Sequence, residues 1–208
     1  MSDATASPVD LLPDLPLRSR GPLAAAFRAL GCHDLRAAAT RVWTLPYGRN
    51  RDPLDELCVL KQRRGTCSTK HALLARLIDE ETIAGIELRL GIYEMSEANT
   101  PGVGATLARH GLTSIPEAHC CLVARGARVD LTRAHGAAAE PIGPFLAEQT
   151  IRPEQIGEHK RAFHRRFLAA RAQARDYGAL TADDLWAIRE ECIAALAEAE
   201  PELGRPAV

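Results

Sequence analysis

Apolar residues recur at three- and four-residue spacing in several stretches of the chain, which is the pattern of amphipathic helices. This spacing predicts helices within five stretches, residues 23–42, 53–60, 67–82, 154–176 and 181–199. The first stretch reads as two short helices separated at Gly31. The third begins at about Cys67, with Thr66 as its N-cap. The last opens with a capping box formed by Thr181 and Asp184.

Alternating apolar and polar residues mark two other stretches as β-structure. Residues 86–92 read as one half-buried strand, and residues 117–131 read as a hairpin. Between them, residues 96–115 form a glycine-bearing connection that is long enough to suggest a functional loop. The order of helices, then strands, then helices predicts an α+β fold with a C-terminal helical extension.

The turn of the hairpin decides which side chains share a face of the sheet. If Arg125-Gly126 are the two loop residues, Ala124 pairs with Ala127. His119 and Asp130 then become diagonal neighbours on one face, within side-chain reach of each other. A three-residue loop would place the two on opposite faces.

Three segments differ in character. Residues 1–21, rich in proline, form an arm that is draped on the domain or disordered. Residues 22–150 form the core, and residues 151–208 form a helical extension that packs on the core or on a second subunit. Five large side chains of this extension are expected to be buried, namely Phe163, Phe167, Leu185, Trp186 and Ile193.

Composition and charge narrow the classes of function. The formal net charge of −1 gives no reason to expect nucleic acid or an anionic membrane as partner. The N-terminus lacks the basic and apolar regions of a secretory signal, and no apolar run approaches the roughly 20 residues of a membrane helix. We therefore expect a cytoplasmic protein whose six cysteines are free thiols, most of them buried.

The stretch Gly65-Thr66-Cys67 places a thiol in the first turn of a predicted helix. The helix dipole and Lys70 would both lower the pKa of that thiol. A nucleophilic cysteine also needs a base and an orienting group, which His119 and Asp130 can supply. His71 lies on the same helix face as Cys67 and is either an alternative base or a core histidine. His119 is preferred because it has an obvious carboxylate partner in the sequence.

The sequence favours a metal site or a nucleic-acid site less than it favours a thiol nucleophile. Cys120 and Cys121, with His110, His119 and His135 in the same region, suggest zinc, but adjacent strand residues point to opposite faces and no C-x-x-C pair occurs. No metal or other cofactor is therefore predicted. The basic helix within residues 154–176 carries an apolar stripe and is followed by an acidic helix, which favours helix packing over nucleic-acid binding.

Three short motifs resemble the transglutaminase-like superfamily of cysteine enzymes, which is related in architecture to papain-like proteases. They are Gly65-Thr66-Cys67-Ser68 at a helix start, Ala118-His119-Cys120-Cys121 in a strand, and Val129-Asp130-Leu131-Thr132 in the next strand. The resemblance covers roughly residues 55–135. It implies a core in which the cysteine-bearing helix packs on an antiparallel sheet, with Cys67, His119 and Asp130 as a catalytic triad.

The activity implied by the resemblance is acyl transfer from an amide or ester of a small molecule, peptide or protein. Cys67 would attack the carbonyl, His119 would shuttle the proton, and Asp130 would hold the imidazole tautomer. The Cys67 amide is one oxyanion donor, and Gln62 and Tyr47 are candidates for the second. Hydrolysis, as in a peptidase, is the expected outcome. An acyltransferase similar to arylamine N-acetyltransferases, and a non-catalytic interaction module, are the alternatives.

Overall fold

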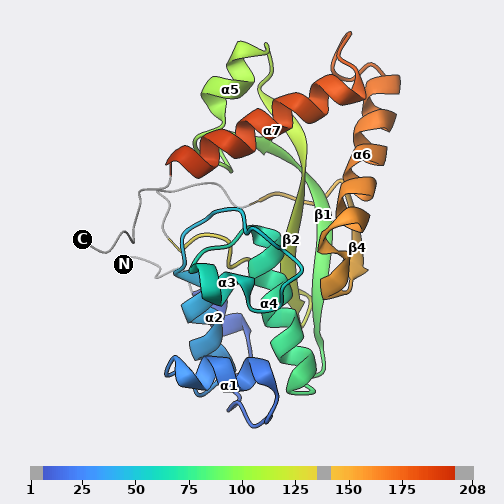
Figure 1. Cartoon of the computed structure of the whole chain (residues 1–208). Coiled ribbons are helices and arrows are strands. Elements are labelled where there is room, and N and C mark those ends of the chain that lie inside the picture. Colours follow the sequence, from blue (N-terminus) through green and yellow to red (C-terminus); the bar gives the residue numbers. More distant parts are fainter. Residues whose placement is uncertain (1–6, 135–141, 200–208) are drawn as a thin grey trace, which may run out of the picture. The chain divides into compact units, whose positions relative to one another are not determined.

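The structure is a computed structural model that describes residues 7–134 and 142–199 (Figure 1). In chain order its elements are η1 (Pro8–Leu11), α1 (Pro22–Ala29), α2 (Leu35–Trp43), α3 (Cys58–Gln62), α4 (Cys67–Glu80), β1 (Ile86–Ser96), α5 (Gly104–Arg109), β2 (Ser114–Ala124), β3 (Ala127–Val129), β4 (Ala147–Ile151), η2 (Pro153–Ile156), α6 (Glu158–Gln173) and α7 (Ala182–Ala199). The strands form one antiparallel sheet in the order β3-β2-β1-β4. The fold is α+β, as the sequence predicts.

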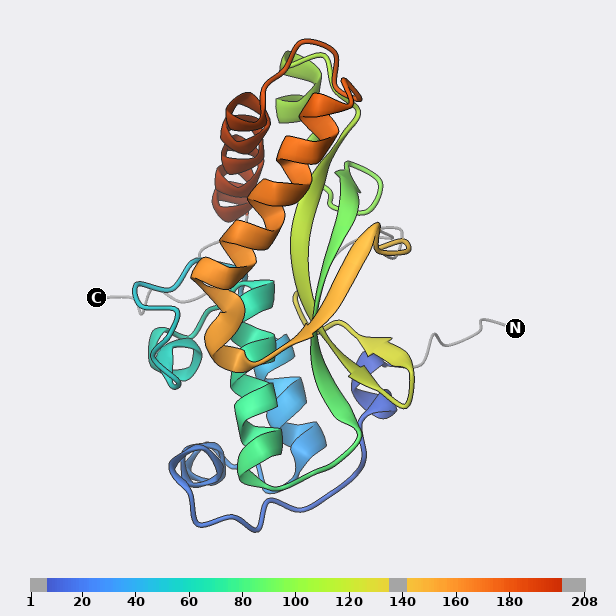
Figure 2. The same cartoon turned by 90° about the vertical axis from the view of Figure 1, so that its right-hand side faces the viewer.

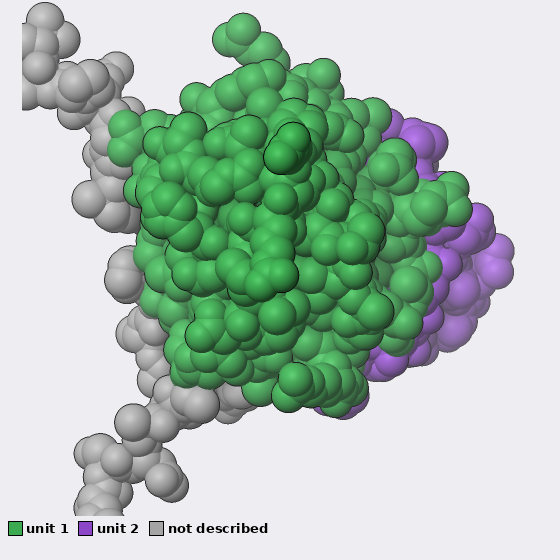
Figure 3. All heavy atoms as spheres, turned by 90° about the horizontal axis from the view of Figure 1, so that it is seen from below, with its two compact units in different colours: residues 1–89, 120–135, 150–156 green, residues 90–119, 136–149, 157–208 purple. Residues whose placement is uncertain are grey.

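The chain divides into two compact units (Figure 3). Unit 1 contains residues 1–89, 120–135 and 150–156, and unit 2 contains residues 90–119, 136–149 and 157–208. Strand β1 passes from unit 1 into unit 2, and β2 returns from unit 2 to unit 1. The predicted boundaries after residues 21 and 150 remain a prediction.

Helix α4 forms the centre of unit 1. It contacts α1, α2, α3 and η2, and Figures 1 and 2 show the first three of these helices gathered around it. Every residue from Cys67 to Ala75 is buried, including the polar ones. The single apolar stripe predicted from the sequence therefore understates how completely this helix is enclosed.

The N-terminal arm is packed against unit 1 along its described part, from residue 7 onward. Leu12 and Leu17 are buried, and the carboxylate of Glu81 accepts hydrogen bonds from the amides of Arg18 and Ser19 at 2.8 and 3.0 Å. Of the two alternatives for this arm, draped on the domain or disordered, the first applies to residues 7–21. Residues 1–6 lie outside the described part of the chain.

The β2–β3 hairpin has the predicted register. Ala124 pairs with Ala127, and the two loop residues Arg125 and Gly126 have φ angles of 52° and 79°. Positive φ at both central residues is the geometry of a type I′ turn, whose twist matches that of the strands. The register prediction is confirmed for the three pairs from Leu122–Val129 to Ala124–Ala127, whereas a shared face for His119 and Asp130 remains a prediction. Pairing ends at Val129, so Asp130 follows the last paired residue.

Replacing Gly126 by alanine should lower the free energy of unfolding by about 1–2 kcal/mol, because an L side chain is strained in the left-handed region. Urea unfolding of the two proteins measures this difference. Gly143→Ala is the matched control, since Gly143 has no positive φ and, apart from its chain neighbours, no atom of the described residues lies within 4 Å of the added Cβ. Equal losses in the two variants would contradict the prediction.

Some local predictions were wrong. Helix α3 begins at Cys58 rather than at Pro53. The carboxylates of Asp52 and Asp55 accept hydrogen bonds from the amides two residues on, which favours turns over helix in this stretch. The predicted connection over residues 96–115 contains α5, and β4 was not predicted because only one of its residues is buried.

In the helical extension, the prediction of buried side chains is confirmed in part for α7, and the buried face of α6 differs from the predicted one. Leu185 and Ile193 of α7 are buried, as expected. Phe163, Phe167 and Trp186 are only half-buried, and the buried residues of α6 are His164 and Leu168. The buried face is therefore shifted by one residue. A polar residue, His164, occupies it and is invisible to a purely apolar pattern.

A buried ion pair lies within unit 2. Arg189 of α7 donates from Nε and Nη2 to the two carboxylate oxygens of Glu117 in β2, at 2.6 and 2.7 Å. Beside it, Nε2–H of the buried His164 donates to the Pro116 carbonyl at 2.8 Å. The guanidinium groups of Arg165 and Arg189 lie 4.4 and 5.2 Å from the ring centre of Trp186.

The opposite charges of α6 and α7 meet in unit 2. Arg165 of α6 forms an ion pair with Asp183 of α7 at 3.1 Å, so at this position a basic residue of one helix is paired with an acidic residue of the other. Absence of a nucleic-acid partner and dimerisation through these helices remain predictions. Among the described residues, no helix is long and apolar enough to cross a membrane.

Candidate active site

The end of α4 that carries Cys67 is fixed by local hydrogen bonds. Thr66 is the N-cap, and its hydroxyl accepts from the Thr69 amide at 3.4 Å, while the Thr69 hydroxyl accepts from the Thr66 amide at 3.0 Å. The Thr69 hydroxyl also donates to Asn50 Oδ1 at 2.7 Å. Cys67 is thus the first residue of a capped helix, as predicted.

Glycine at position 65 is required by packing. A Cβ added there would lie 2.9 Å from Cγ of Lys70 and 3.1 Å from a methyl group of Val59. The first distance is shorter than real Cβ atoms show, and the second is tighter than nine in ten real Cβ contacts. Gly65, which precedes the Thr66-Cys67 pair, therefore leaves space for the Lys70 side chain that packs against it.

Cys67 is 7% exposed, and its sulfur lies 3.8 Å from the Ser68 hydroxyl. All six cysteines are free and buried, which confirms the prediction of free thiols. Burial raises the pKa of Cys32 and Cys58, and it raises the pKa of Cys192 to about 11 with a further contribution from Glu117. These three thiols are poorly suited to act as nucleophiles near neutral pH.

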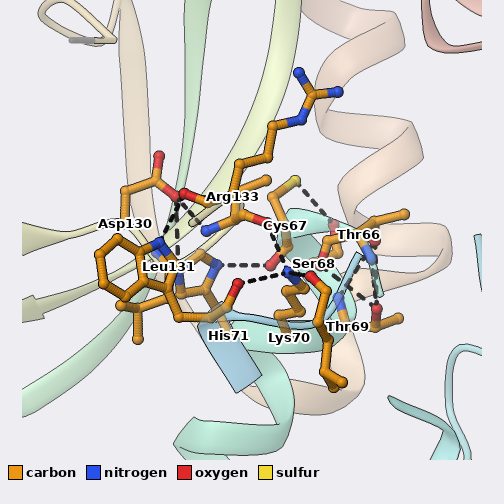
Figure 4. Close-up of polar contacts among 12 residues, drawn as sticks. Thr66, Cys67, Ser68, Thr69, Lys70, His71, Asp130, Leu131 and Arg133 are labelled. Carbon is orange, nitrogen blue, oxygen red and sulfur yellow. Dashed lines mark hydrogen bonds and ion pairs between the residues drawn. The ribbon is translucent and has the colours of Figure 1, made fainter. Parts of the chain in front are cut away.

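Lys70 is fully buried and binds three backbone carbonyls. Its Nζ donates to Leu45 at 2.5 Å, to Thr132 at 2.7 Å and to Trp43 at 3.3 Å. Figure 4 shows this side chain beside His71, with both reaching from α4 towards the segment after β3. The sequence suggests a charge effect of Lys70 on the thiol, but in the structure Lys70 ties two backbone segments to α4, one at the end of α2 and one after β3.

His71 is held by backbone groups on both ring nitrogens. Nδ1 lies 2.7 Å from the Cys67 carbonyl, to which it must donate, and Nε2 then accepts from the Leu131 amide at 2.8 Å. This arrangement fixes the neutral Nδ1–H tautomer. Protonation of Nε2 would break the bond to Leu131. Of the two alternatives for His71, the core histidine fits the structure and the base does not.

Asp130 follows β3 and is held by a tight turn. Its Oδ1 accepts from the amide and the hydroxyl of Thr132 at 3.0 and 2.6 Å, and it lies 3.8 Å from Nε2 of His71 (Figure 4). The side chain is 38% exposed. The reason for preferring His119 over His71, a carboxylate partner for His119 alone, was therefore wrong, because Asp130 is also close to His71.

His119 belongs to unit 2, where it is buried in β2. Its ring meets Tyr93 edge-on, with centroids 5.7 Å apart, and lies 6.5 Å from the ring of Phe145. Cys67 and Asp130 belong to unit 1. The assignment of His119 as the base of a triad with these two residues remains a prediction.

The two candidates for a second oxyanion donor lie in the segments before Cys67. Tyr47 pairs with Gly65 in a parallel bridge, and the guanidinium of Arg133 lies 4.9 Å from the centre of its ring. Gln62 ends α3, and its side-chain oxygen accepts from the Arg51 amide at 3.1 Å. Gln62 therefore braces the loop before the cysteine helix. Donation by either residue to an oxyanion remains a prediction.

The cysteines and histidines considered as zinc ligands do not form a metal-binding cluster among the described residues. Cys120 and Cys121 are buried in β2, and Nε2 of His110 lies 3.0 Å from a carboxylate oxygen of Glu191. Within residues 7–134 and 142–199, no group of three metal-ligating side chains could hold an ion. His135 lies outside the described residues.

The structural roles of two residues in this region were not identified from the sequence. Asn50 joins the loop before α3 to Thr69, and its Nδ2 donates to the Arg64 carbonyl at 2.9 Å. Thr132 holds the Asp130 carboxylate. The signal for Thr132 was present, since Asp-x-Thr is a typical local turn, whereas nothing local identifies Asn50.

No protein-family model, curated protein or solved structure matches the chain.

Proposed function

We propose that this protein is a cysteine-dependent acyl-transfer enzyme that hydrolyses an amide or ester through Cys67. The observation that carries the proposal is the placement of Cys67 as the first residue of a capped, enclosed helix. The amide groups in the first turn of a helix lack intrahelical acceptors, and with the helix dipole they stabilise a thiolate and a developing oxyanion.

The proposed reaction has two stages. The Cys67 thiolate attacks the carbonyl carbon, the bond to the leaving group breaks, and a thioester forms. His119, the base predicted from the sequence, takes the thiol proton and gives it to the leaving group. Water then attacks the thioester while His119 accepts its proton, which releases the acid and restores the thiol. Asp130, held by Thr132, orients the imidazole.

The proposal predicts that Cys67 is alkylated by iodoacetamide at pH 6 at least about 10-fold faster than Cys32 or Cys192. An ordinary cysteine has a pKa near 8.5, whereas helix ends and cationic neighbours bring it to roughly 3.5–7.5. The measurement is the alkylation rate of each cysteine in the folded protein, read by peptide mass spectrometry. His119→Ala should slow alkylation of Cys67 at this pH, because it removes the proton acceptor.

Asp130→Asn is the matched comparison. It should leave alkylation of Cys67 nearly unchanged but slow turnover, because it disturbs the tautomer of the imidazole more than the charge at sulfur. If Cys67 reacts no faster than Cys32 and Cys192 at pH 6, the proposal that Cys67 is a nucleophile is wrong. A non-catalytic interaction module would then be the better description.

A further inference from the structure

Two consecutive side chains of α4 bind the same short segment after β3. Lys70 donates to the Thr132 carbonyl, and His71 accepts from the Leu131 amide. Both side chains are fully buried. They lie three and four residues after Cys67, so the helix that carries the thiol also fixes the backbone that carries Asp130.

The three hydrogen bonds that Lys70 Nζ donates indicate that the amine is in its charged ammonium form. Three carbonyl oxygens surround Nζ within 3.3 Å. Carbonyl oxygens only accept, so three N–H groups are needed, and only the ammonium form has three. Each of these charge-assisted bonds is stronger than a bond between neutral groups. Thr132 is therefore bound to α4 by one of the strongest types of contact in unit 1.

Thr132 transmits this restraint to the carboxylate. Its carbonyl binds Lys70, while its amide and hydroxyl both donate to the same oxygen of Asp130. Two donors on one carboxylate oxygen, 3.0 and 2.6 Å away, leave the other oxygen to face a different partner. The direction of the Asp130 side chain is thus set by a chain of contacts that starts at Lys70.

We infer that Lys70 is a positioning residue for Asp130: by holding Thr132, it fixes the orientation of the carboxylate relative to the helix that carries Cys67. The inference rests on the proposed function, since it assigns Lys70 a part in the same acyl transfer. Lys70 touches neither the substrate nor the reacting atoms in this role. Its effect reaches the reaction through Asp130 and the histidine that Asp130 orients.

Two acetyl donors with different leaving groups isolate this effect. With p-nitrophenyl acetate, the thiolate of Cys67 attacks the acetyl carbon and nitrophenolate leaves without needing a proton. With p-nitroacetanilide, the same thioester forms, but the departing nitrogen must receive a proton from the histidine. Both are rates of the acylation step, read as release of the first equivalent of nitrophenolate or nitroaniline, because the later hydrolysis of the thioester also uses the histidine. The ester rate then reports the thiolate, and the ratio of the anilide rate to the ester rate reports the oriented histidine.

Lys70→Met should lower the anilide rate by about 10- to 100-fold, the loss expected when a catalytic group is misplaced by about 1 Å. It should change the ester rate by less than about 3-fold. Asp130→Ala should show the same pattern. Leu74→Ala, a fully buried position one turn further along α4, is the control for lost stability and should change both rates by the same factor.

The outcomes separate this inference from the proposed function. If Cys67→Ala still cleaves both donors, the proposed function fails. If Cys67→Ala is inactive but Lys70→Met lowers both rates equally, the inference alone is overturned, as it is if the parent cleaves only the ester. Should Lys70→Met not fold, Thr132→Val tests the link through which Lys70 acts, because it removes the hydroxyl bond to Asp130 and keeps the carbonyl that Lys70 binds. An unchanged ratio of anilide to ester rate in Thr132→Val would overturn the inference.

Discussion

Replacement of Arg189 by methionine is expected to lower the free energy of unfolding by about 3–5 kcal/mol. Glu117 is 5% exposed, and its carboxylate receives two hydrogen bonds from the guanidinium. Methionine fills much of the space of the arginine stem but leaves a buried charge without its partner. Breaking one side of a buried ion pair costs far more than an exposed pair contributes, because the remaining charge cannot regain water.

Urea unfolding of the parent and the variant measures this loss. Arg161→Met is the matched control, because Arg161 pairs with Glu158 on the surface of α6 and is 63% exposed. That variant should change stability by no more than about 1 kcal/mol. The double variant Glu117→Gln with Arg189→Met should recover part of the stability. A loss of less than about 1 kcal/mol in Arg189→Met would show that the ion pair is not buried as described.

Stability should also fall steeply in acid because of the same ion pair. Burial by itself would raise the pKa of Glu117, but the charge and hydrogen bonds of Arg189 outweigh it and hold the pKa at about 2, below the ordinary 4.5. Between these two pH values the unfolded chain binds a proton that the folded protein does not. Stability from Glu117 is therefore complete above about pH 4.5 and is lost as pH falls towards 2. The full change is roughly 3 kcal/mol.

Unfolding free energies measured between pH 6 and pH 3 test this prediction. His164 adds a slope in the same direction, since burial lowers its pKa from 6.5, but its contribution begins at higher pH. The double variant Glu117→Gln with Arg189→Met isolates the carboxylate, because it removes the group that titrates. An equally steep loss below pH 4.5 in that variant would exclude Glu117 as the cause.

These two predictions concern the strand that carries the proposed base. Glu117 and His119 are both in β2, two residues apart, so their side chains leave the strand on the same side. The ion pair with Arg189 fixes β2 at this point within unit 2. Variants at Glu117 are therefore a poor choice for testing catalysis, because a loss of activity would have a structural explanation.

Features that depend on a few neighbouring residues could be predicted from the sequence. The capped start of α4 needs only residues 66–69, because the hydrogen bonds that define it join residues three positions apart. The register of the β2–β3 hairpin follows from Arg125-Gly126, since the chain must reverse within two residues. The α+β class and the position of Cys67 followed from these local signals.

The roles of the side chains around Cys67 were decided only by the tertiary structure. His71 meets the Leu131 amide across 60 residues of sequence, and Lys70 meets the Thr132 carbonyl across 62. A local pattern shows a lysine and a histidine on one helix face, and from such a pattern a charge effect and an alternative base are reasonable hypotheses. Which backbone groups accept or donate these hydrogen bonds depends on how distant segments pack, and that packing directs both side chains to the segment after β3.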